Sequence, residues 1–234
     1  MKNKILSKEF YLQETSVVAK NLLGKLIYRH SDKGMLIARI VETEAYLAEN
    51  DPACHAFYKK TKKNEKMFEE GGISYVYLIY GFYYCLNIVT GHKDRGEAVL
   101  IRALEPIDGI EAMKEFRSVE KEHQLTNGPG KLCKALNINL EDNGLDVITS
   151  KKLFLTEDRN FNDNEIVVTT RIGITKATEL PLRFYVKDNK YISKKWALKH
   201  LLFYSVFTYA SRKEFATFAF SLKKTLFWKF RIYF

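Results

Sequence analysis

The sequence has few cysteines and no long apolar run, and each shortage excludes a class of protein. Its three cysteines among 234 residues, Cys54, Cys85 and Cys133, form no CxxC pair, so no disulfide framework, structural zinc site or iron–sulfur site is expected. No stretch approaches the ~20 apolar residues of a membrane-spanning helix, and the segment MKNKILSKEF lacks the apolar core of a signal peptide. The unpaired cysteines and the lack of a signal peptide predict a cytoplasmic protein. No glycine-rich phosphate loop occurs, so no nucleotide cofactor is expected.

Apolar and basic residues are abundant, and the basic ones are unevenly distributed. The chain is 46% hydrophobic and 14% aromatic, which suffices for a packed core and excludes a disordered protein. Its net charge of +10 favours an anionic partner. Residues 194–234 hold nine Lys or Arg and only Glu214 as an acid, so their charge is +8 and residues 1–193 carry +2. This shift predicts a domain over 1–193 and a basic, aromatic-rich extension over 194–234.

The extension admits several interpretations. Its apolar and basic residues alternate in a way that suits a basic amphipathic helix pair, a membrane-surface segment or a DNA-contacting segment. A poorly ordered extension without a role fits equally well. Its role therefore stays open at this point.

Residues 1–193 mix helical and strand patterns. Strands are predicted over 36–46 and 98–104, and over a pair within 74–89 that turns at Tyr80 and Gly81. Shorter strand-like segments are 145–149, 152–155, 166–174 and 182–186. We expect helices after Thr15 as N-cap, from Pro106 to Phe116, and from the turn 127–131 through Leu136. Strands without crossover helices between them favour an α+β fold around a curved, largely antiparallel sheet with a protruding hairpin and flanking helices.

The strand LIARIVETEAY presents two acids on one face. Its period of two places Glu42, Glu44 and Tyr46 together. One interpretation is a strand that runs from the core into solvent, and the other is a carboxylate beside an aromatic wall that activates water. His55 follows nine residues after Tyr46 and adds little by itself.

The segment YVYLIYGFYYCLNIV predicts an aromatic hairpin. Tyr77 lies on one face and Tyr80 stands at the tip, where Gly81 permits a tight reversal. The strand preference of tyrosine explains such a hairpin without any function, whereas the functional alternative is an aromatic wedge that enters a stacked ligand. Five lysines occupy the eight residues 59–66, a position suited to phosphate contacts or simply to a solvated loop.

Six segments between about Phe10 and Ser193 resemble, in order, the alkyladenine DNA glycosylase family, also called methylpurine or 3-methyladenine DNA glycosylases. They are VETEAY with His55, the stretch Thr61–Phe68, YVYLIYGFYYCLN, VLIRALEP, NGPGKLCKAL and PLRFYV. The resemblance implies a monofunctional enzyme, without lyase activity, metal or cofactor, that flips an alkylated or deaminated purine out of duplex DNA and hydrolyses its N-glycosidic bond in base excision repair. It also implies a monomer without an obligate protein partner.

The resemblance assigns roles residue by residue. Glu44 is expected to be the general base that activates water, and Arg102 to hold that water. Tyr46 is expected on one side of the flipped base, with His55 and Tyr77 on the other. Further expected positions are Asn87 at the pocket floor, where it rejects the guanine amino group, Tyr80 as the intercalating wedge, and Lys59, Lys60, Lys63 and Lys131 at the DNA backbone.

The sequence departs from the family pattern at Lys63, where an arginine is expected. Lysine keeps the charge and loses the bidentate fork for a phosphate. The extension 194–234 lies beyond the resemblance altogether. Two other functions remain open, a lesion-binding protein that does not cut and an RNA-binding protein that uses the same aromatic surface.

Overall fold

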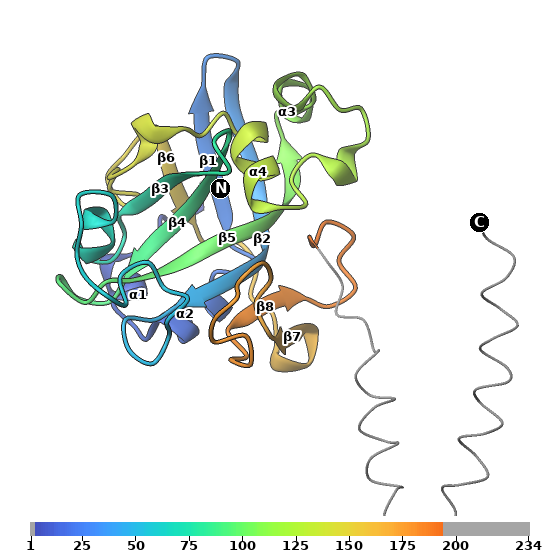
Figure 1. The fold of residues 1–234 in the computed structure, drawn as a ribbon. Helices are drawn as coiled ribbons and strands as arrows, with labels where there is room; N and C mark the ends of the chain where they lie inside the picture. Colours follow the sequence, from blue (N-terminus) through green and yellow to red (C-terminus); the bar gives the residue numbers. More distant parts are fainter. Residues whose placement is uncertain (1–2, 194–234) are drawn as a thin grey trace, which may run out of the picture. The chain divides into compact units, whose positions relative to one another are not determined.

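Eight strands pair into one curled sheet, and every pairing is antiparallel (Figure 1). The computed structural model describes residues 3–193 of the chain. The strands are β1 (Leu26–Ser31), β2 (Gly34–Tyr46), β3 (Ser74–Ile79), β4 (Tyr83–Thr90), β5 (Glu97–Asp108), β6 (Leu153–Thr156), β7 (Ile166–Thr169) and β8 (Arg183–Val186). Their main order is β3-β4-β5-β2-β1-β6, and β8 pairs with both β2 and β7. The predicted α+β class with a largely antiparallel sheet is confirmed.

Within residues 3–193, four short α-helices and four 3-10 turns accompany the sheet. The α-helices are α1 (Lys8–Tyr11), α2 (Thr15–Asn21), α3 (Ile110–Arg117) and α4 (Pro129–Ala135). The 3-10 turns are η1 (Glu65–Phe68), η2 (Glu122–Gln124), η3 (Leu140–Asp142) and η4 (Asp163–Glu165). Helix α2 packs against β2 and β5, α4 packs against β4 and β5, and α3 packs on α4. No helix among residues 3–193 is long and apolar enough to cross a membrane.

The long strands β2 and β5 form the centre of the core. β2 pairs with β5 along its length, with β1 through its first half and with β8 through Glu42, Thr43 and Glu44. Every residue from Ile40 to Ala45 is buried, although successive side chains of a strand point to opposite faces, so both faces of β2 are covered here. Glu42 and Glu44 are therefore core residues, and the interpretation of a strand running into solvent is wrong.

Four details of the predicted elements are wrong. Thr15 is the first residue of α2 and makes no cap; its hydroxyl instead binds Thr90 on β4, 2.7 Å away. The helix predicted from Pro106 begins only at Ile110, because β5 continues to Asp108 along its partner β2. Residues 145–149 make one isolated bridge instead of a strand, and β7 ends at Thr169, so 170–174 is a loop.

The hairpin of β3 and β4 reverses through Tyr80 and Gly81, as predicted. Both residues have positive φ, 53° for Tyr80 and 78° for Gly81, and the Phe82 N–H donates to the Ile79 carbonyl, 3.3 Å away. Three residues, 80–82, thus connect the paired residues Ile79 and Tyr83, and the positive φ of both central residues of the turn 79–82 is that of a type I′ turn. Glycine adopts it freely, whereas a tyrosine there is strained. The side chain of Tyr80 is 75% exposed.

A buried ion pair connects the loop after β2 to the loop after β7. Arg171, in the loop after β7, binds both carboxylate oxygens of Asp51, in the loop after β2, at 2.6 Å each, and both side chains are fully buried. Arg171 also donates to the Ala45 carbonyl, and Asp51 accepts the N–H groups of Leu47 and Ala53. The pair thus fixes loop backbone on both sides of the end of β2.

The C-terminal extension predicted over 194–234 lies outside the described residues.

We predict that Asp51→Asn destabilises the fold by about 3 kcal/mol, because it leaves the buried Arg171 guanidinium without a counter-charge. Urea denaturation measures the loss. The matched control is Asp163→Asn, which removes an ion pair with Lys20 whose aspartate side chain is 90% exposed, and which should cost less than about 1 kcal/mol. Equal effects of the two substitutions would contradict the role assigned to the buried pair.

Candidate active site

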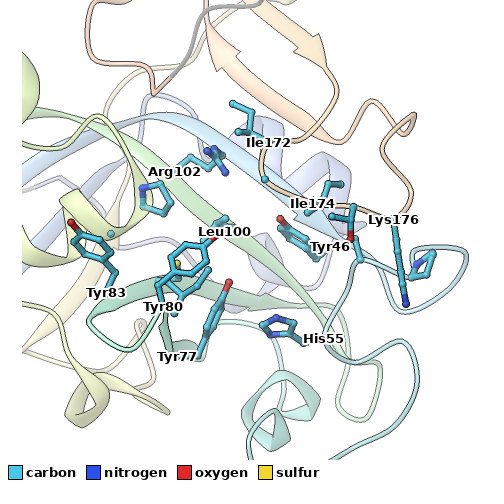
Figure 2. Close-up of a pocket in the computed structure, with 18 residues that line it drawn as sticks. Tyr46, His55, Tyr77, Tyr80, Tyr83, Leu100, Arg102, Ile172, Ile174 and Lys176 are labelled. Carbon is cyan, nitrogen blue, oxygen red and sulfur yellow. The ribbon is translucent and has the colours of Figure 1, made fainter.

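A cavity of about 470 Å³ opens between the hairpin, the end of β2 and the loop 172–176 (Figure 2). Its size lies within the roughly 300–1,000 Å³ of small-molecule sites. The lining combines aromatic rings with few charges: Tyr46, His55, Tyr77, Tyr80 and Tyr83 supply rings, while Arg102 and Lys176 supply cations. Gly130 of α4 also lines it, and a side chain there would meet the Tyr83 ring at 2.9 Å, so this glycine lets helix and hairpin approach closely.

Glu44 lies directly behind the cavity wall. Its Oε1 accepts the Ile172 N–H at 2.8 Å, and its Oε2 accepts the Tyr46 hydroxyl at 2.9 Å and lies 3.1 Å from Nη1 of Arg102. All three partners line the cavity, whereas Glu44 itself is fully buried and does not. Burial raises the pKa of the Glu44 carboxyl, against the lowering effects of Arg102 and the two hydrogen bonds. A carboxylate with a raised pKa is suited to accept a proton.

An irregularity in the sheet brings Arg102 to Glu44. The register of β2 and β5 shifts on either side of Glu42, so that Val41 on β2 and Arg102 on β5 have no partner in the ladder. Such bulges redirect side chains and are frequent beside active sites. Arg102 consequently reaches two carboxylates, with its Nε donating to Glu42 at 3.2 Å and its Nη1 next to Glu44. Glu42 and Glu44 thus share a face, as the period of two predicts.

Tyr46 forms one wall of the cavity. The guanidinium of Arg171 lies 4.7 Å from the centre of its ring. Because Arg171 is buried and does not line the cavity, it braces the ring from the protein side. The same arginine holds Asp51, so the buried ion pair also orients this wall.

His55 and Tyr77 form a second wall. Their ring centres are 4.7 Å apart in an edge-to-face arrangement, and His55 Nδ1 lies 3.1 Å from the Tyr75 hydroxyl. Figure 2 shows the rings of Tyr46, Tyr77 and His55 around the same space. Burial lowers the pKa of His55, because it disfavours the charged imidazolium.

Asn87 occupies a different position from the predicted pocket floor. It is buried on β4, its Nδ2 donates to the Tyr75 carbonyl at 3.1 Å, and it does not line the cavity. The lining at this level comes from Cys85 on the same strand and from Leu100, the residue opposite Asn87 on β5. Asn87 thus lies next to the lining residue Leu100 but outside the lining itself, and its part in rejecting guanine stays a prediction.

The predicted backbone-contacting lysines belong to two separate elements, the loop before η1 and helix α4. Lys59, Lys60 and Lys63 are exposed in the loop before η1, where Lys60 lies over the Phe68 ring, 5.3 Å from its centre. Lys131 is half-buried on α4 and donates to Asn127 at 2.9 Å. About 70 residues of sequence separate the two groups, and the contacts of both with DNA stay predictions.

Several groups of the site have no counterpart in the sequence interpretation. The Ile172 N–H binds Glu44 through the backbone, which no residue type signals. Arg171 and Asp51 lie 120 positions apart, and only their opposite charges could have suggested that they form an ion pair. Lys176 lines the cavity and donates to the Tyr58 hydroxyl at 2.8 Å.

Within residues 3–193, no three His, Cys, Asp or Glu side chains are grouped in a way that would hold a metal ion. The chemistry that the site offers on its own side chains is a buried carboxylate next to a guanidinium, beneath a cavity of aromatic rings.

Comparisons with known proteins point to one family. The model of the methylpurine-DNA glycosylase family matches residues 9–190. A protein of Carboxydothermus hydrogenoformans is 50% identical over 191 residues, which cover 82% of this chain and all of that protein. Proteins of Francisella tularensis and Clostridium botulinum are 50% and 47% identical, covering 78% and 82% of this chain and 95% and 100% of their own lengths. All three are provisionally named 3-methyladenine DNA glycosylases.

The match extends through the strands and loops that build the cavity and ends before the basic extension. The chain belongs to the methylpurine-DNA glycosylase family.

Proposed function

We propose that this DNA glycosylase removes alkylated purines such as 3-methyladenine, and deaminated purines such as hypoxanthine, by hydrolysing the N-glycosidic bond of a base flipped into the cavity. The observation that carries the proposal is the buried Glu44 carboxylate, held by Tyr46, Arg102 and Ile172 at the cavity wall. A protein that only binds a lesion or an RNA has no need of a buried carboxylate at this place.

The cavity suits a charged base and a charged transition state. Alkylation makes a purine cationic and therefore a good leaving group, so the enzyme has to provide electron-rich faces and a water nucleophile. Tyr46 and Tyr77 offer the faces. Glu44 accepts the proton of the water, and its negative charge stabilises the positive charge that develops on the sugar. Arg102, in the cavity wall, orients the water.

Base flipping is proposed because the reacting bond is inaccessible within stacked DNA. The strained, exposed Tyr80 at the hairpin tip lies at the rim of the cavity, where an aromatic ring fills the gap that a flipped nucleotide leaves. Backbone strain of this kind persists where a function maintains it. The exposed Lys59, Lys60 and Lys63, with Lys131, are proposed to contact phosphates.

We also propose that the enzyme is monofunctional and acts as a monomer. Lyase chemistry needs an amine nucleophile, and the lysine of the lining, Lys176, is exposed at the rim and engaged with Tyr58. The carboxylate, the aromatic walls and the wedge all come from one chain, so no second copy and no protein partner is needed to complete the site.

Replacing the carboxylate tests the chemistry. Glu44→Gln keeps the shape and removes the base, so we expect single-turnover release of hypoxanthine or 3-methyladenine from duplex DNA to fall at least about 100-fold. The DNA strand should stay intact until alkali is added, as for a glycosylase without lyase activity. Equally slow release by wild type and variant would contradict hydrolysis and favour a binding protein.

Removing the Tyr46 hydroxyl tests the control of Glu44. The hydroxyl donates to the carboxylate and lowers its pKa, so Tyr46→Phe raises that pKa while the ring remains. Since the base must be ionised, the acid limb of the pH–rate profile for hypoxanthine release should move to higher pH. An acid limb at or below the wild-type position would contradict this hydrogen bond as a determinant of basicity.

The wedge is tested by Tyr80→Asn, which creates the Asn-Gly pair preferred in this turn. In a Glu44→Gln background, which prevents turnover, we expect the preference for hypoxanthine-containing over undamaged duplex to fall, with little change in salt-dependent nonspecific binding. Because asparagine tolerates positive φ, stability should rise by up to about 1 kcal/mol. Equal losses of affinity for both duplexes would contradict a wedge.

A further inference from the structure

Glu42 is a second buried carboxylate of the site, and the proposed hydrolysis assigns it no role. It lies two residues before Glu44 on β2 and is fully buried. Its Oε1 accepts Nε of Arg102 at 3.2 Å and Nε of Arg183 at 2.7 Å. Ser193 adds its backbone N–H, 2.6 Å from Oε2, and its hydroxyl, 2.8 Å from Oε1. So many donors converge on one carboxylate only where its position is closely fixed.

Arg102 is shared between the two carboxylates. Its Nε is bound to Glu42, its Nη1 lies next to Glu44, and its Nη2 lies 3.4 Å from the Ser193 hydroxyl. The guanidinium is planar with its donors in a fixed fork, so anchoring Nε determines where the Nη1 edge points. Glu42 therefore sets the direction in which Arg102 meets Glu44 and the cavity.

The charges of these groups balance in pairs. Two carboxylates, Glu42 and Glu44, are in contact with or near two guanidiniums, Arg102 and Arg183. The negative charge of Glu42 raises the pKa of Glu44, while Arg102 lowers it. The other titratable or charged groups that face Glu44 are Tyr46 on β2, Cys85 on β4 and Arg171 in the loop after β7. Without Glu42, the charge of Arg102 would act on Glu44 alone.

We propose that Glu42, held by Arg183 and Ser193, is the positioning residue of this site: it aims Arg102 at the cavity and balances the charge of Arg102 against that of Glu44. This inference rests on the proposed hydrolysis. Removal of the Glu42 charge lets Arg102 move toward Glu44, so that the guanidinium leaves the water site and the base becomes weaker.

Full-length Glu42→Gln tests the proposal by single-turnover release of hypoxanthine from duplex DNA across the acidic and neutral pH range. We expect the rate to fall on the order of 10- to 100-fold, with the acid limb displaced to lower pH and the affinity for the duplex unchanged. Glu42→Asp keeps the charge and shortens the side chain, so its rate should fall while its acid limb stays at the wild-type position.

The matched control is Glu105→Gln. Glu105 is a carboxylate of β5 that pairs with Arg39 of β2 at 2.9 Å, in the same two strands and outside the site. Its rate and pH profile should equal those of wild type. Should Glu42→Gln not fold, Ser193→Ala takes its place, since it removes one donor to Glu42 and no charge; we expect about a 2- to 10-fold loss of rate that Ser193→Thr, which keeps the hydroxyl, does not show.

The outcomes separate the two proposals. A wild-type protein that releases no base contradicts the hydrolysis itself. Wild-type release together with unchanged kinetics of Glu42→Gln, or of Ser193→Ala where that variant stands in, overturns the role of Glu42 and leaves the hydrolysis intact. A slower Glu42→Gln with an unmoved acid limb overturns it as well, because packing alone would then explain the loss.

Discussion

A carboxylate removed from water is stable only where other groups replace its hydration, and Glu44 depends on this condition. A guanidinium, a phenol and a backbone N–H surround it, each from a different segment of the chain. The guanidinium of Arg102 comes from the bulge between β2 and β5, the phenol of Tyr46 from the end of β2, and the N–H of Ile172 from the loop after β7. The curled sheet, the bulge and the tied loops can thus be understood as the means of placing one ionisable group behind a cavity wall.

The site separates rigid support from exposed contact. The residues around Glu44 and Glu42 are buried and joined in a network of charge-assisted hydrogen bonds, whereas Tyr80 and the lysines of the loop before η1 face solvent. Tyr80 has a strained, positive φ, whereas the strand residues Glu42, Glu44 and Arg102 do not. The groups proposed for chemistry, which need fixed geometry, and the groups proposed to contact DNA therefore belong to different parts of one fold.

What the sequence predicted were the features encoded by neighbouring residues. The alternation of VETEAY placed Glu44 beside Tyr46, and Tyr80 before Gly81 predicted the hairpin tip, because both depend on local geometry. Features that depend on distant partners escaped prediction. The bulge at Arg102 breaks the alternation without any marker, and the Ile172 N–H is common to all residue types. Pro106, a typical helix start, lies in β5 because pairing with β2 overrides local preference.

The hydrogen bonds of Ser193 make the last described residue part of the buried network around Glu42. Its N–H and hydroxyl both donate to the buried Glu42 carboxylate, so a chain that stopped before Ser193 would leave that carboxylate without two of its donors. A truncated or fused form of this fold, whether it arises in evolution or by protein engineering, therefore has to keep Ser193 in place.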